Sequence, residues 1–138
     1  IGLANPNALL IARSCFDAVH QIGWPESRII LSEAAIYLAC SPKSNTAYLA
    51  IDKAIETVRK TGDKAVPLHL RNAPTRLMKD LDYGSDYKYA HSYDSSFIEE
   101  NYLPDELKGS VFYTPGDNIR ENEFRKKLKE LWKKYYDY

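Results

Sequence analysis

Residues 44–60, SNTAYLAIDKAIETVRK, carry the clearest structural pattern in this 138-residue chain. Apolar side chains recur there every three or four residues, at Ala47, Ile51, Ala54, Ile55 and Val58. A helix turns once in 3.6 residues, so this spacing puts all five on one side of an α-helix. Gly62 then supplies the left-handed stop that helices favour. The stretch predicts a helix from Ser44 to about Lys60 with one side in a core.

Two more helices are expected before it. In the first, Asn5 can cap, Pro6 suits the first helical position and Gly23 ends the helix. Its apolar stripe is wide, with Leu9, Leu10, Ile11, Ala12, Cys15, Phe16, Val19 and Ile22. A stripe this wide indicates packing against more than one neighbour. The second helix, about Ser32 to Ser41, has almost no polar side and is expected to be central. The run 28–31 before it is compatible with extended chain.

After Gly62, the hydrophobic pattern becomes irregular and then helical again. A connector at 63–73 leads to a short helix from Pro74 to about Asp82. Residues 85–117 show no long helix, only single turns near 95–101 and 104–107. The last helix, about Ile119 to Tyr136, has its apolar side at Phe124, Leu128, Leu131, Trp132 and Tyr135.

The predicted fold class is therefore all-α: a helical bundle of four to five main helices, with an ordered aromatic-rich irregular segment lying on it. We expect a single helical domain over 1–138. It comprises a three-helix portion at 1–62, a connector, short helix and tyrosine-rich segment at 63–118, and an amphipathic helix at 119–138.

Composition excludes several function classes. The 19 basic and 19 acidic residues balance, which argues against a protein whose affinity comes mainly from neutralising phosphates. The last twenty residues nevertheless carry seven Lys or Arg against four acids. No window approaches a membrane span, and no signal peptide opens the chain. Cys15 and Cys40 both lie in apolar helical runs, so we expect reduced thiols. Because the first residue is Ile1, we expect a piece of a longer cytosolic protein.

The sequence offers little for catalysis. His20, His69 and His91 are isolated, so no pair has the spacing that zinc needs. Neither GxxxxGK[ST] nor GxGxxG occurs, so no P-loop is present for ATP. We expect no cofactor, no metal and no catalytic site in this chain. A free-standing enzyme is the third hypothesis, and it requires a pocket that gathers His69, Arg71 and an acid.

Residues 67–91, PLHLRNAPTRLMKDLDYGSDYKYAH, are the densest in recognition-type side chains. Arg71 can bind a phosphate or a carboxylate, or it can simply satisfy loop carbonyls. Tyr83, Tyr87, Tyr89 and Tyr93 suit base stacking, a protein interface or an aromatic mini-core, and the acids around them disfavour nucleic acid. The candidate interface residues, chosen for their size and place in or near this stretch, are Leu70, Arg71, Leu77, Tyr87, Tyr89 and Phe97.

The last helix carries a basic side opposite its apolar one. The candidate DNA contacts there are Lys126, Lys129 and Lys133. Glu121, Glu123 and Glu130 dilute this patch, and such a side is often only solvated.

Several motifs, in order, resemble one family. IGLANPNAL at Ile1–Leu9 is similar to the family's IGLADPNAL opening, with Asn5 in place of the acid. The motifs that follow, in the family's order, are IYLA at 36–39 with SPKSN at 41–45, YLA at 48–50, PLHLRNA at 67–73, YKYAH at 87–91, and YLP at 102–104 with LKG at 107–109. These runs, from Ile1 to about Pro115, resemble the C-terminal region of the replication-associated recombination protein A (MgsA) ATPases. Their eukaryotic relatives include the Werner helicase-interacting protein.

The resemblance implies a fold similar to the clamp-loader collar, which holds subunits together, typically as a homotetramer. It implies a bacterial cytoplasmic parent at the nucleoid, a DNA-dependent ATPase of replication-fork maintenance, recombination and repair. ATP and magnesium would belong to its AAA+ module, which this chain lacks. The parent's partners would be its own copies, DNA and single-stranded DNA-binding protein, with no membrane. The main hypothesis is an oligomerisation and scaffold domain; the alternative is a DNA- or partner-docking module that uses the basic last helix.

Overall fold

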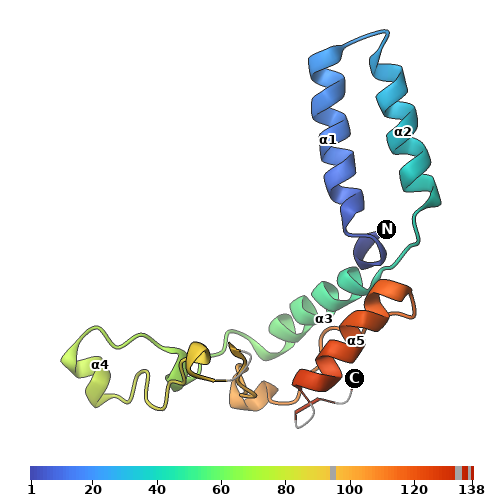
Figure 1. Cartoon of the computed structure of the whole chain (residues 1–138). Coiled ribbons are helices and arrows are strands. Elements are labelled where there is room, and N and C mark those ends of the chain that lie inside the picture. Colours follow the sequence, from blue (N-terminus) through green and yellow to red (C-terminus); the bar gives the residue numbers. More distant parts are fainter. Residues whose placement is uncertain (94–95, 133–134, 137) are drawn as a thin grey trace. The chain divides into compact units, whose positions relative to one another are not determined.

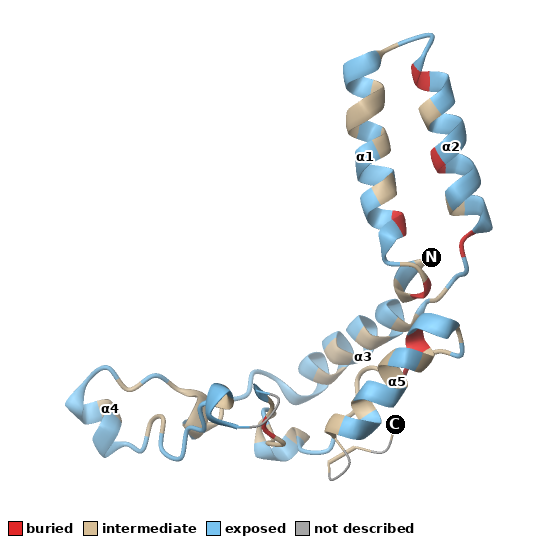
Figure 2. Ribbon diagram, viewed as in Figure 1, coloured by how far each residue is buried: buried red, intermediate tan, exposed pale blue. Residues whose placement is uncertain are grey.

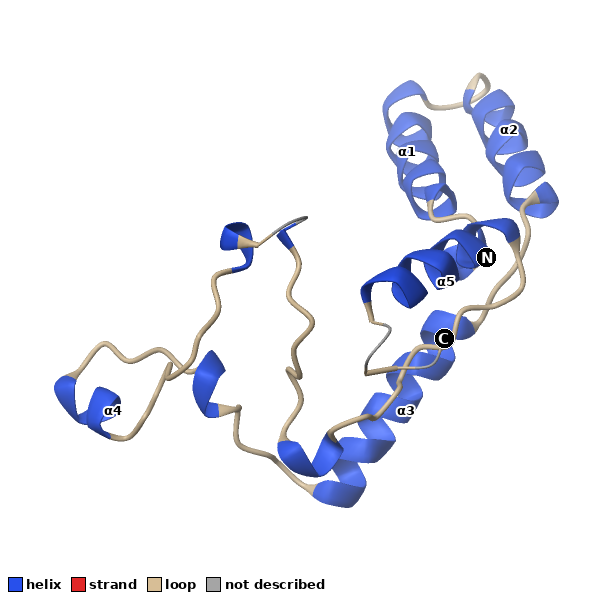
Figure 3. Ribbon diagram, turned by 60° about the horizontal axis from the view of Figure 1, so that its bottom comes forward, coloured by secondary structure: helices blue, strands red, loops and turns tan. Residues whose placement is uncertain are grey.

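Helices are the only regular secondary structure in the described part of the chain (Figures 1 and 3). The computed structural model describes residues 1–93, 96–132, 135–136 and 138. Its α-helices are α1 (Asn7–Ile22), α2 (Ser27–Cys40), α3 (Thr46–Thr61), α4 (Arg76–Asp80) and α5 (Ile119–Leu131). Short 3-10 turns are η1 (Gly2–Ala4), η2 (Leu68–Leu70), η3 (Ala90–Ser92) and η5 (Asp105–Leu107). The predicted all-α class with four to five main helices is confirmed.

The chain divides into two compact units. Unit 1 comprises residues 1–53 and 112–126, and unit 2 comprises residues 54–111 and 127–138. The first halves of α3 and α5 therefore belong to unit 1 and the second halves to unit 2. No helix in the described residues is long and apolar enough to cross a membrane.

In unit 1, α1 and α2 form an antiparallel hairpin. Gly23 ends α1 as predicted, with a φ of 73° that favours glycine. α2 begins at Ser27, so the suggestion that 28–31 is extended was wrong. The helices approach closely where the small side chains Ala8 and Ala34 are buried. Most of the remaining hairpin surface is exposed (Figure 2), so α2 does not have the central position predicted from its apolar sequence.

Asn5 has a different role from the predicted one. The residue at the N-cap position of α1 is Pro6. The Asn5 side-chain amide instead donates to the Ser41 hydroxyl at 2.9 Å and to the Tyr37 hydroxyl at 3.1 Å. It thereby ties the chain before α1 to the last turn of α2. Asn5 stands where the family opening has an acid, and this position contacts the end of α2.

In unit 2, the chain makes a closed loop around α4. Thr75 caps α4 by accepting a hydrogen bond from the Met78 amide at 3.3 Å, and the helix ends at Asp80. The loop closes where the Gly84 amide donates to the Leu68 carbonyl at 2.8 Å. The predicted turn near 104–107 is confirmed as η5. The turn expected near 95–101 lies partly outside the described residues, because 94–95 are not among them.

The end of unit 2 is an aromatic cluster around Trp132. Its indole meets the rings of Phe97, Tyr102 and Tyr136 at centroid distances of 5.1, 6.2 and 5.5 Å. α5 ends at Leu131 rather than near Tyr136. An aromatic mini-core therefore exists, but its members are not the four tyrosines at 83–93 from which it was predicted.

Candidate functional site

The most completely built polar site is a buried carboxylate in unit 1. Glu121 lies in the first turn of α5 and has no exposed surface. Its carboxylate accepts hydrogen bonds from the Thr46 hydroxyl, the Asn118 amide and, at 3.0 Å, the Tyr113 hydroxyl. The side-chain oxygen of Asn118 in turn accepts a hydrogen bond from the backbone amide of Glu121 at 3.0 Å, as an N-cap residue does. We call this set of residues the Glu121 clasp.

The electrostatics of the clasp hold Glu121 ionised. Burial raises the pKa of a carboxyl, but the hydrogen bonds from Thr46, Ser44, Gly116 and Asn118 outweigh it and lower the pKa of Glu121 to about 2. Burial and the same carboxylate raise the pKa of Tyr113 to about 12. A carboxylate with a pKa this low is a poor general base at neutral pH. The clasp therefore joins α3 to α5 and is not a catalytic centre.

Arg125 holds the loop before α5. Its guanidinium donates to the Pro115 carbonyl at 2.6 Å, to the Gly116 carbonyl at 3.1 Å and to Asp117 at 3.1 Å. Gly116 is required to be small, because a Cβ there would lie 3.0 Å from the Glu121 carboxylate. The loop and the clasp therefore form one rigid connection within unit 1.

The proposed polar site at Arg71 lies in unit 2, where Arg71 is used inside the chain. Its Nε donates to the Val66 carbonyl at 2.6 Å, and its guanidinium lies over the Tyr83 ring at 4.8 Å. Both contacts agree with the alternative in which the Arg71 side chain bonds to groups of its own loop.

A cavity beside Arg71 tests the enzyme hypothesis. Its volume is about 410 Å³, and it is lined by His69, Arg71, Asp105 and Glu106 among others. His69 Nε2 is buried with no hydrogen-bond partner in the described residues. The predicted gathering of His69, Arg71 and an acid therefore occurs. No Ser, Thr or Cys lines this cavity, so it holds no hydroxyl or thiol nucleophile for a base to activate, and its Glu106 is paired with Lys64 at 3.4 Å.

The candidate interface residues all lie in unit 2 and differ in exposure. Leu77, Tyr87 and Tyr89 are exposed, with Leu77 at 68 %. Leu70 and Phe97 are half-buried, and Phe97 packs edge-on against Trp132. Tyr93 is also exposed, whereas Tyr83 is half-buried under Arg71. Three of the six candidates are thus free to meet a partner.

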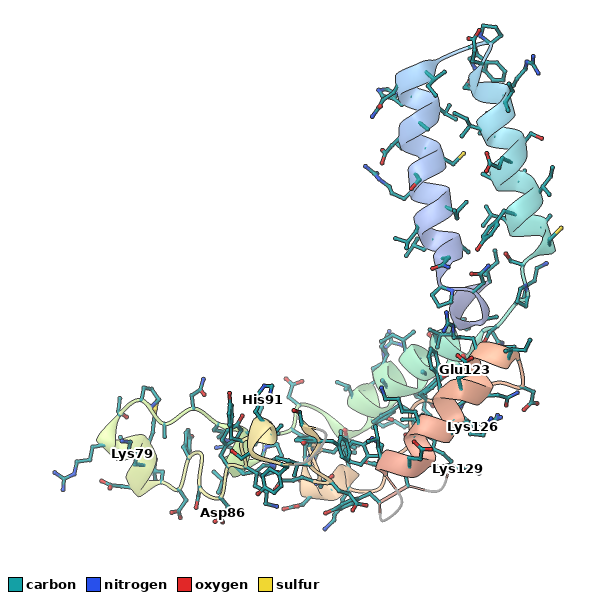
Figure 4. The ribbon with its side chains drawn as sticks, viewed as in Figure 1. Lys79, Asp86, His91, Glu123, Lys126 and Lys129 are labelled. Atoms are coloured by element: carbon teal, nitrogen blue, oxygen red, sulfur yellow. The ribbon has the colours of Figure 1, made fainter. Side chains whose placement is uncertain are left out.

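The candidate DNA contacts lie along α5. Lys126 and Lys129 are exposed and follow Glu123 at three-residue intervals (Figure 4). Lys133 lies outside the described residues. Glu123 is paired with Arg120 at 3.3 Å.

The described residues contain no group of three or more His, Cys, Asp or Glu side chains placed to hold a metal ion. No two glycines in the sequence have the spacing of a phosphate-binding loop.

Sequence reasoning missed one surface, which is formed by apolar side chains of the hairpin. Leu9 and Phe16 of α1 are 78 % and 65 % exposed, although their periodicity predicted a core position. The useful signal was the width of the α1 stripe, which exceeds what α2 alone covers.

Comparison with known proteins gives consistent matches over nearly the whole chain. The model of one protein family, described as MgsA AAA+ ATPase C terminal, matches residues 1–132. Replication-associated recombination protein A of Coxiella burnetii is 43% identical over 129 residues, which are 93% of this chain and 29% of that protein. The protein of the same name from Bacillus subtilis is 42% identical over 136 residues, 97% of this chain and 31% of its own length.

A eukaryotic relative also matches. The ATPase WRNIP1 of Dictyostelium discoideum is 41% identical over 114 residues, which are 82% of this chain and 13% of that protein. The chain therefore spans less than a third of the length of each of these three relatives.

Proposed function

Because the chain belongs to the family of MgsA AAA+ ATPase C-terminal domains, we propose that it is the oligomerisation and scaffold domain of such an ATPase. The parent protein acts in replication-fork maintenance, recombination and DNA repair in the bacterial cytoplasm, at the nucleoid. Its subunits form a homotetramer, and it works with DNA and single-stranded DNA-binding protein. ATP and magnesium are bound by its AAA+ module and not by this chain.

The observation that supports an assembly role is apolar surface on regular helices. In the unit 1 hairpin, Leu9 and Phe16 are 78 % and 65 % exposed and, seven residues apart, lie on one side of α1. Contiguous apolar patches on a folded surface mark interaction sites, because single exposed apolar residues are common and clusters are not.

The mechanism is geometric. AAA+ sites work in series only if their subunits stay in a fixed arrangement, and most soluble assemblies achieve this by closed symmetry. This domain holds its copies together through apolar helical surface, and the clasp joins α3 to α5 within unit 1. It contributes no group to the chemistry of ATP hydrolysis.

The test is the solution mass of the chain by light scattering over a hundredfold range of concentration. A stable dimer or tetramer supports the proposal. A monomer at every concentration contradicts it for these 138 residues. The double variant Tyr87→Ala and Tyr89→Ala tests the interface residues predicted from sequence, and an unchanged mass with retained helicity excludes them.

A second candidate function is DNA docking through α5, favoured by the exposure of Lys126 and Lys129 on one helix. Charge reversal of both residues, with Lys133 in a triple variant, should abolish retention on DNA and leave the subunit mass unchanged. The matched control is reversal of Lys79 and Lys108, two exposed lysines elsewhere in the chain. Equal loss in the control would show only a net-charge effect, which contradicts a site on α5.

A further inference from the structure

Arg71 uses only part of its hydrogen-bonding capacity inside the chain. Its Nε bond to the Val66 carbonyl and its stacking over the Tyr83 ring fix the position and the plane of the guanidinium. The two terminal nitrogens donate to no described residue, and Arg71 forms no ion pair with a described carboxylate. A half-buried guanidinium held in this way is ready to bind an anion.

Arg71 also lines a second cavity in unit 2, different from the one that contains Asp105 and Glu106. Its volume is about 400 Å³, and we call it the Arg71 pocket. It is lined by His69, Leu70, Arg71, Asn72, Ala73, Gly84 and Tyr87. None of the described residues that line it is acidic. A neighbouring cavity on the other side of His69 differs, because Asp82, Asp86 and Glu100 line it.

Three further polar groups surround Arg71 in this pocket. The Asn72 amide and the Tyr87 hydroxyl belong to exposed side chains and form no hydrogen bond with a described residue. His69 Nε2 is buried and also has no partner among the described residues. Buried polar nitrogens in native proteins are nearly always hydrogen-bonded, so this atom has a capacity that the described chain does not use. The pocket therefore gathers groups that can donate to the oxygens of an anion.

Gly84 sets the shape of the Arg71 pocket. Its amide donates to the Leu68 carbonyl at 2.8 Å, and its φ is 71°. A Cβ at this position would lie 3.1 Å from the Arg71 carbonyl, so the backbone at 84 approaches the backbone at 71 more closely than a larger residue allows. Backbone contacts hold the two sides of the pocket together, and a ligand therefore binds with little ordering of the chain.

The charge of the pocket suits a carboxylate better than a phosphate. Arg71 supplies one positive charge, and the Asn72 amide and Tyr87 hydroxyl are neutral donors. A carboxylate carries one negative charge and pairs with the arginine fork, whereas a phosphate monoester carries nearly two. The acids of the neighbouring cavity add negative charge close by, which opposes a nucleic-acid backbone.

From these observations we propose that the Arg71 pocket binds one carboxylate of an acidic peptide. The terminal nitrogens of Arg71 donate to its two oxygens, and Asn72 and Tyr87 add further hydrogen bonds. The carboxylate belongs to an Asp or Glu side chain or to the end of a chain, since both present the same pair of oxygens. This site lies within unit 2 and does not require copies to assemble, so it goes beyond the proposed function.

The test is an NMR titration of the 138-residue chain with three short peptides acetylated at the N-terminus. The first is Ala-Glu-Ala with an amidated end, the second is Ala-Gln-Ala with an amidated end, and the third is Ala-Gln-Ala with a free carboxylate. The first should shift the side-chain signals of Arg71 and Asn72 with a Kd on the order of millimolar, as for one charge-assisted contact. The second should not shift them. The third separates the end of a chain from a side chain as the source of the carboxylate.

Two variants and a matched control locate the site. Asn72→Asp places a negative charge in the pocket without removing a hydrogen bond between described residues. Asn45→Asp is the control, because Asn45 is an exposed asparagine of unit 1. Asn72→Asp should weaken binding of the Ala-Glu-Ala peptide at least about tenfold, and Asn45→Asp less than about twofold. Tyr87→Phe keeps the ring, removes one donor and should weaken binding about fivefold.

Four results overturn the proposal. One is the absence of any shift with both carboxylate peptides at tens of millimolar, and another is equal binding of the amidated Ala-Gln-Ala peptide. The third is equal loss in Asn72→Asp and Asn45→Asp, which would be an effect of net charge alone. The fourth is tighter binding of methyl phosphate than of either carboxylate peptide. The titration does not depend on the subunit mass, so its failure and the failure of the proposed function are distinguishable.

Discussion

Glu121 is the residue on which the order of unit 1 depends most. A fully buried carboxylate is costly unless hydrogen bonds replace its water, and here four side chains and a backbone amide do so. Its place in the first turn of α5 adds the favourable field of a helix N-terminus. Nothing in the sequence around ENEF distinguishes Glu121 from the exposed Glu123, because the partners Ser44 and Thr46 are distant along the chain.

Stability should therefore fall in acid. Unfolded Glu121 takes up its proton near pH 4.5, whereas the folded chain takes it up only near pH 2. The stabilisation is complete above about pH 5 and disappears as the pH falls to about 2, amounting to about 3 kcal/mol. Urea unfolding at pH 7 and pH 3 measures it. Glu121→Gln should remove most of this pH dependence, while Glu123→Gln should keep it; an unchanged pH dependence in Glu121→Gln would contradict the role of the clasp.

Asn5 offers a second test at this scale. Asn5→Ala removes both hydrogen bonds to the end of α2 and should cost about 1 kcal/mol of unfolding free energy. Asn5→Asp, which restores the acid of the family opening, should cost less, because the Tyr37 hydroxyl can donate to a carboxylate. Thermal unfolding of the two variants decides the point. If Asn5→Ala matches the wild type, the contact does not contribute to hairpin stability.

Helix ends were predicted well where a backbone conformation marks them and poorly where only side-chain spacing was available. Gly23 and Gly62 were recognised because a φ near 70° is a glycine conformation. The start of α2 was missed, since the apolar run 28–31 suits a strand and a helix equally. The end of α5 was placed too late, because Tyr135 continues the helical spacing although it packs in the Trp132 ring cluster.

The ring cluster predicts a local effect on unit 2. Trp132→Ala removes the ring that Phe97 and Tyr102 meet edge-on, and should cost about 2 to 3 kcal/mol, less than a fully buried Trp because Trp132 is half-buried. The control is Trp24→Ala, since Trp24 is 72 % exposed and should be nearly neutral. Hydrogen exchange should accelerate at residues 96–102. Unchanged protection there would show that the rings do not order this segment.

For the molecule as a whole, sequence could identify which side chains are apolar but not what covers them. Leu9, Phe16 and Ile51 have the periodicity of core residues and are exposed. Phe97, a candidate interface residue, packs on a ring of its own chain. Burial in one's own core and burial against another copy leave the same hydrophobic signal, so periodicity cannot separate them.

If copies assemble, thermal stability should depend on concentration. Association stabilises the folded state by mass action, so Tm should rise over a hundredfold increase in protein concentration. Differential scanning calorimetry measures the rise. A constant Tm in the wild-type chain would contradict assembly through any surface.

The clasp can form only late in the synthesis of the chain. It joins Thr46 to a residue 75 positions later, so the ribosome must add all of those residues before the carboxylate can arrive. At about 5 to 20 residues per second this takes roughly 4 to 15 seconds. During that interval the hairpin has left the ribosome with its exposed apolar side chains bare and the clasp still unformed. The nascent chain is then most in need of a chaperone.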